Sequence, residues 1–135
     1  MKLAIIAFLP ALMSIGCAAT PDSRPTTAVV DALRNAGVVV EDAGIVEQPF
    51  FPVSAHVYRA DGDDVQVYEF ATPAEAEAAA AQVAPNGGSI GTTMMHWMAP
   101  PHFFRKDRLI VNYLGNSPKV MGELQRLLGA QFAGQ

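Results

Sequence analysis

Three segments of the chain carry apolar residues at helical spacing, and each begins with residues typical of a helix start. The first segment covers residues 27–36, and Thr26 is its expected N-cap. The second covers residues 72–84, where Thr72 and Glu75 form a capping box around a proline. The third covers residues 117–128 and again opens with a serine and a proline. This pattern predicts three helices.

Five further segments are rich in β-branched and aromatic residues, which is typical of strands. They cover residues 38–46, 55–58, 65–70, 90–98 and 109–114. The resulting order is α-β-β-β-α-β-β-α, and consecutive strands favour antiparallel pairing with helices packed on one face. We therefore expect an α+β, two-layer domain with a mostly antiparallel five-stranded sheet and about three helices on one face.

The first seventeen residues have the order of a secretory signal. Lys2 precedes an apolar run over residues 3–15, and small residues then lead to Cys17. This run is too short to span a membrane as a helix, which takes about 20 apolar residues. Ser14-Ile15-Gly16-Cys17 resembles the lipobox of bacterial lipoproteins, although the family usually has leucine where this chain has Ser14.

The lipobox resemblance implies a division of the chain and a location. Residues 1–16 would be a signal peptide, Cys17 would carry the lipid, residues 17–25 would form a tether, and residues 26–135 would be one domain. Because Ala18 is not aspartate, the resemblance implies the outer membrane, facing the periplasm, in a cell with two membranes. The alternative is an ordinary signal peptide cut near Ala19, which would discard Cys17.

Composition narrows the classes of partner. The chain has 135 residues and a net charge of −4, so it lacks the basic surface that nucleic-acid binding requires. One cysteine excludes a disulfide within the chain. Arg105, Lys106 and Arg108 form a basic cluster, which we interpret as a solvated turn rather than an anion site.

A methionine-rich segment is the first candidate site. If residues 90–98 form a strand, Met94, His96 and Met98 share one face, and Met95 and Trp97 share the other. Two thioethers and one imidazole suit Cu(I), and the residue types resemble those of small periplasmic copper chaperones. The alternative is that the methionines and the tryptophan fill an irregular core, which is a common use of methionine.

A proline-stiffened segment is the second candidate. Two consecutive prolines precede a histidine and two aromatic residues, and this arrangement favours a rigid recognition loop for an envelope protein or an apolar ligand. The residues of this candidate binding loop are Pro100, Pro101, His102, Phe103 and Phe104. The alternative is that the two phenylalanines cover an open sheet edge.

No motif assigns catalytic residues. The chain lacks a Gly-x-Ser-x-Gly elbow and a phosphate-binding loop. His56, His96 and His102 could bind zinc if they converged, but their spacing matches no known zinc pattern. An enzyme whose active site is assembled from distant residues remains an alternative.

The chain from Tyr68 onward resembles a group of short, uncharacterised bacterial secreted proteins and lipoproteins. The shared residues are Ile90-Gly91-Thr92-Thr93, Trp97, the segment from Pro100 to Phe104, Arg108-Leu109-Ile110-Val111, Gly115, Leu128-Gly129 and Phe132-Ala133-Gly134. The resemblance implies no activity and no catalytic residue. Together with the anchor, these observations favour a membrane-tethered binding or interaction module, and the alternatives are a small envelope enzyme or a Cu(I)-binding protein.

Overall fold

A computed structural model gives the structure of the protein and describes residues 24–135. The predictions about the signal peptide, Ser14, Cys17 and most of the tether therefore lie outside the described residues. Among the residues described, no helix is both long and apolar enough to cross a membrane.

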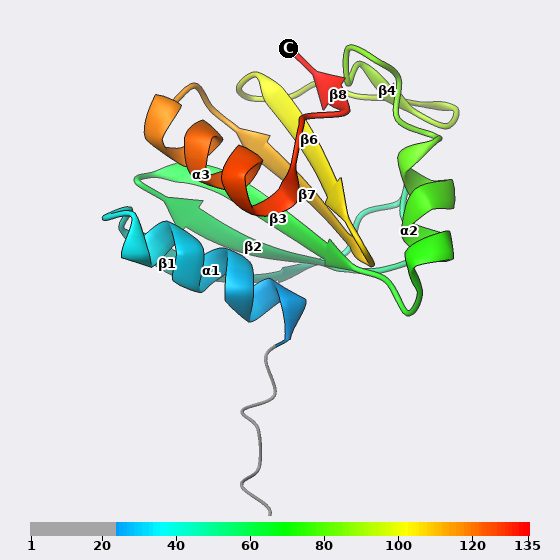
Figure 1. Ribbon diagram of the computed structural model, residues 1–135. Helices are drawn as coiled ribbons and strands as arrows, with labels where there is room; N and C mark the ends of the chain where they lie inside the picture. The colour runs from blue at the N-terminus through cyan, green and yellow to red at the C-terminus, as the bar shows by residue number, and fades with distance from the viewer. Residues whose placement is uncertain (1–23) are drawn as a thin grey trace, which may run out of the picture.

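The main sheet has six antiparallel strands in the order β1-β2-β3-β7-β6-β8 (Figure 1). Three helices accompany it, so the predicted α+β class with a mostly antiparallel sheet is confirmed. The strands of this sheet are β1 Val40–Val46, β2 Ala55–Ala60, β3 Asp63–Glu69, β6 Pro101–Lys106, β7 Leu109–Leu114 and β8 Ala133–Gly134; the helices are α1 Pro25–Asn35, α2 Pro73–Ala80 and α3 Pro118–Leu128.

The helices lie on both faces of the sheet, which corrects the expectation that all three share one face (Figure 1). Side chains alternate along β3, so that Val65 and Val67 pack with α1 and α3 while Tyr68 packs with α2. All six residues of β7 are buried. A strand that is apolar at successive positions must be covered on both sides, which explains why α2 lies opposite α1 and α3.

The predicted strand over residues 90–98 is wrong. Only a two-stranded hairpin forms there, from β4 Ser89–Ile90 and β5 Thr93–Met94, and it lies outside the main sheet. Gly91 has a φ of +58° and turns the chain after two residues. The strand next to β7 is instead β6, which starts at Pro101, a position where a missing N–H is tolerated.

The helix caps follow the sequence signals in two of three cases. The Thr72 hydroxyl accepts a hydrogen bond from the Glu75 N–H, and Ser117 accepts one from Val120. Helix α1 begins earlier than predicted, at Pro25, and its N-cap makes no side-chain hydrogen bond. The Thr26 hydroxyl, expected to cap α1, instead donates to Glu69 of β3. This contact joins the start of α1 to the sheet.

Candidate functional site

The predicted recognition loop is not a loop, because Pro101, His102, Phe103 and Phe104 lie in β6. Both phenylalanine side chains are 0% exposed: Phe103 packs on the α2 side of the sheet and Phe104 on the side of α1 and α3. Pro100 lies just before the strand and is partly buried. The prediction that these aromatic residues are offered to a partner is therefore wrong, since Pro101 starts a strand instead of breaking one.

His102 is an internal structural residue. Its side chain is buried, and its Nε2 atom donates a hydrogen bond to the Gly115 carbonyl oxygen at 2.9 Å. Its Nδ1 atom lies 3.0 Å from Oε1 of Gln131. Through these contacts His102 ties β6 to the segments that flank α3.

The three histidines do not converge. His56 lies in β2, His102 in β6, and His96 in the segment after β5. Within residues 24–135, no group of three or more histidine, cysteine, aspartate or glutamate side chains could hold a metal ion.

The basic cluster forms the tight turn between β6 and β7, as expected. Arg105 is exposed, Lys106 donates to the Leu127 carbonyl oxygen at 3.1 Å, and Arg108 pairs with Glu69 at 2.9 Å. Asp107 takes a positive φ of 51° at the turn. Lys106 and Arg108 therefore already have partners within the domain.

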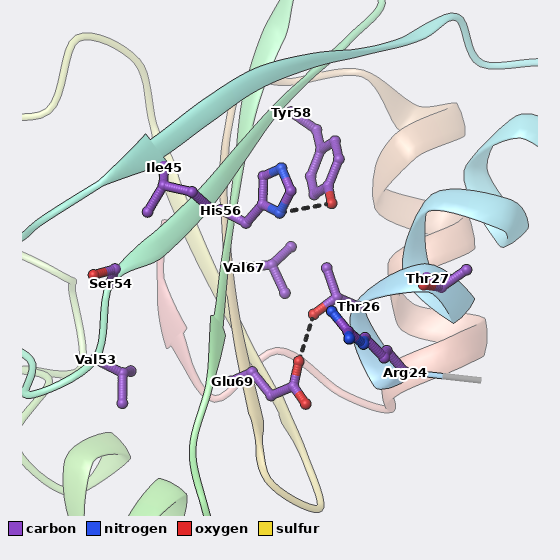
Figure 2. A pocket seen from close by; sticks show the side chains of 10 residues that line it. All are labelled: Arg24, Thr26, Thr27, Ile45, Val53, Ser54, His56, Tyr58, Val67 and Glu69. Carbon is purple, nitrogen blue, oxygen red and sulfur yellow. Dashed lines mark hydrogen bonds between the residues drawn. The ribbon is translucent and has the colours of Figure 1, made fainter. Parts of the chain in front are cut away.

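One polar pocket was not among the sequence candidates. A pocket of about 370 Å³ lies between the start of α1 and strands β1, β2 and β3 (Figure 2). Its lining residues are Arg24, Thr26, Thr27, Ile45, Val53, Ser54, His56, Tyr58, Val67 and Glu69. The pocket therefore combines aliphatic surface with hydrogen-bonding and charged groups.

One wall of the pocket is formed by His56 and Tyr58, which belong to a hydrogen-bonded chain of three side chains. Nδ1 of His56 lies 3.0 Å from the Tyr58 hydroxyl (Figure 2). Behind this wall, the Asp42 carboxylate lies 2.9 and 3.0 Å from Nε2 of His56. His56 and Tyr58 are two residues apart on β2, so they share a face, and their rings stack at 4.3 Å. A β-bulge between Asp42 and Ile45, with Gly44 at a φ of +91°, interrupts the register of β1 next to this wall.

The ionisation of the two end groups sets the direction of these hydrogen bonds. The Gly44 N–H, and then the hydrogen bond from His56, hold the pKa of Asp42 below its usual value. Burial, and then the nearby Asp42 charge, raise the pKa of Tyr58. At neutral pH Asp42 is therefore an acceptor, and His56 donates to it from Nε2. In a neutral ring this leaves Nδ1 to accept the hydrogen bond of the Tyr58 hydroxyl.

The opposite side of the pocket is built around Glu69. One carboxylate oxygen accepts the Thr26 hydroxyl at 3.0 Å, and the other pairs with Arg108 at 2.9 Å. Figure 2 shows Arg24 beside Thr26 at this end of the pocket. Both carboxylate oxygens are thus held in place, which fixes the shape of this wall.

Part of this site was readable in the sequence. The His-x-Tyr spacing in a predicted strand places both rings on one face, and the Asp-x-Gly sequence is typical of a turn or bulge. What the sequence does not reveal is that α1 begins at Pro25 and lies over this part of the sheet. The pocket depends on that placement.

The chain was compared with protein families, with curated proteins and with solved structures, and none of them matched.

Proposed function

We propose that the protein is a membrane-tethered, extracytoplasmic binding module that takes a small ligand with both apolar and hydrogen-bonding parts. The observation that carries the proposal is the pocket of about 370 Å³ beside α1. Its volume falls in the range of small-molecule sites, which is about 300–1,000 Å³. Ile45, Val53 and Val67 would contact the apolar part, while Ser54 and Thr26 would contact the polar part.

The hydrogen-bonded wall favours recognition over catalysis. The Tyr58 hydroxyl is protonated at neutral pH, burial raises its pKa further, and it can donate its hydrogen bond to neutral His56. His56 is in turn engaged by Asp42 through its second nitrogen. Side chains that are already fixed by partners lose little conformational entropy when a ligand binds, and this pre-organisation supports affinity.

The tether gives the pocket a location. In the proposed lipoprotein, Cys17 carries the lipid and its sulfur-linked chains enter the membrane, by default the outer membrane of a cell with two membranes. Arg24 lines the pocket and lies seven residues after Cys17. An extended chain of that length spans at most about 25 Å. The pocket would therefore open close to the lipid surface.

The test uses a matched pair of substitutions. Thr27→Phe puts a large side chain on an exposed position that lines the pocket, and Thr92→Phe makes the same change at an exposed position in the hairpin between β4 and β5. Each protein is purified from membranes of its own host in mild detergent and weighed by native mass spectrometry. We expect a non-covalent small-molecule adduct on the parent and on Thr92→Phe, and none on Thr27→Phe.

Two outcomes would overturn separate parts of the proposal. A parent protein without an adduct, or an adduct that survives Thr27→Phe, would reject the pocket as a binding site. A chain mass that does not begin at an acylated Cys17 would reject the tether.

A further inference from the structure

The segment after β5 presents alternate side chains to solvent and to the core. Met95 and Trp97 are partly buried and pack against the α2 side of the sheet. Met94 and Met98 point the other way and are 74% and 98% exposed, and His96 is exposed as well. The alternation predicted from the sequence thus holds, although the regular strand ends at Met94.

The inward-facing residues hold this segment in place. The Trp97 indole N–H donates to the Gly87 carbonyl oxygen at 2.7 Å, and the Met95 N–H donates to that of Gly88 at 3.0 Å. The Trp97 ring also meets the rings of Phe50 and Phe103 edge-on, at 6.4 and 5.9 Å. The backbone from which the three outward side chains project is therefore fixed by neighbours.

Packing explains Met95 but not the two exposed methionines. Methionine is common in cores because its flexible thioether fills irregular gaps, and Met95 does this. Met94 and Met98 gain little from burial, since most of their surface is in water. Two exposed thioethers with an exposed imidazole between them, on a segment whose backbone is held by its neighbours, therefore need another explanation.

We propose that Met94, His96 and Met98 bind one soft monovalent metal ion, Cu(I) in the cell. Thioether sulfur and neutral imidazole nitrogen are ligands that this ion prefers. Residues two apart in an extended chain are separated by about 6.6 Å, a gap that the long side chains of methionine and histidine can bridge. The site is independent of the pocket: it lies by the β4–β5 hairpin beside α2, whereas the pocket lies by α1 (Figure 1).

The chain contains one tryptophan, Trp97, which lies between His96 and Met98 in the sequence and therefore reports on binding. The mature full chain, purified from membranes, is titrated with Ag(I), a redox-stable analogue of Cu(I), while Trp97 fluorescence is followed. Cu(I) affinity is then measured without oxygen by competition with a chromogenic Cu(I) chelator. We expect one ion per chain and a change in Trp97 fluorescence that saturates.

The variants test whether metal binding depends on the two exposed methionines or on any methionine of the chain. The double variant Met94→Leu/Met98→Leu keeps apolar side chains of similar size and should weaken binding by about 100-fold or more, since two of three soft ligands are lost. Met121→Leu, on α3, should bind within about twofold of the parent, because it leaves the soft ligands unchanged. Any binding at Cys17 would be the same in all three proteins and would cancel in the comparison.

The proposal would be overturned if the parent bound Ag(I) and Cu(I) no more tightly than the double variant does. Thermal unfolding of each protein checks that the substitutions leave the fold intact, which we expect because both methionines are exposed.

Discussion

Replacing Asn112 by leucine should stabilise the domain. Asn112 lies in the middle of β7 and its side chain is 0% exposed. Within residues 24–135, neither its Oδ1 nor its Nδ2 atom has a hydrogen-bond partner. Its neighbours across the sheet are Gln66 on β3 and Phe103 on β6. A buried amide is thus left without a hydrogen-bond partner in the middle of the sheet.

The expected gain follows from the cost of this burial. Each buried polar group left without a partner costs about 1–3 kcal/mol, so the two unpaired atoms of Asn112 together cost about 2–6 kcal/mol. Leucine branches at the same carbon but carries two larger methyl groups in place of the polar atoms. After allowing about 1–2 kcal/mol for imperfect packing of this larger side chain, the net gain in unfolding free energy should lie between about 0 and 5 kcal/mol, with a central value of roughly 2 kcal/mol. For a domain of this size, the melting temperature should rise by roughly 3–12 °C.

The assay is thermal and guanidinium unfolding, with Gln66→Leu as the control. Gln66 is also a buried amide, and it faces Asn112 across the β3–β7 pair, but its Oε1 accepts the Tyr68 hydroxyl at 2.9 Å. Gln66→Leu leaves that hydroxyl unpaired and should destabilise the domain by about 1–3 kcal/mol. If Asn112→Leu unfolds at or below the parent temperature, the amide has a partner in solution and the reasoning is refuted.

Two further predictions concern pH. Because the pKa of Asp42 is lowered in the folded state, its stabilising contribution is present above the usual aspartate pKa and is lost as the pH falls through the lower, folded value. Urea unfolding followed below pH 5 should therefore show a loss of stability that is smaller in Asp42→Asn, and equal slopes in the two proteins would contradict it. Burial, and then the hydrogen bond to Asp63, raise the pKa of Tyr113 to about 12. Its contribution is present below the usual tyrosine pKa of about 10 and is lost as the pH rises toward about 12, so Tyr113→Phe should flatten the alkaline side of the stability profile, and an unchanged profile would contradict this.

Local signals predicted the elements whose residues interact with near neighbours. The caps at Thr72 and Ser117 depend on contacts within a few residues, and the strand Leu109–Leu114 is marked by its own run of β-branched, aliphatic and aromatic residues; all three are as predicted. The predictions that were wrong, such as the strand over residues 90–98 and the recognition loop, have a different cause. Pro101 can start a strand because β6 pairs with β7. The local sequence around Pro101 does not indicate which segment the strand will pair with. Likewise, the sequence around Val65 and Tyr68 carries no signal that a helix packs on each face of β3.

The same distinction explains why the proposed Cu(I) ligands could be named from the sequence and the pocket could not. Met94, His96 and Met98 belong to one five-residue stretch, and alternation along an extended chain is enough to place them together. The pocket needs Thr26, His56 and Glu69, which lie on three elements and are brought together by tertiary packing. The hydrogen bond between Thr26 and Glu69 spans 43 residues, and Thr26 lies inside α1 instead of capping it. A residue that gives up a local role for a distant contact is the feature that marks this pocket, and it can be recognised only after the chain has folded.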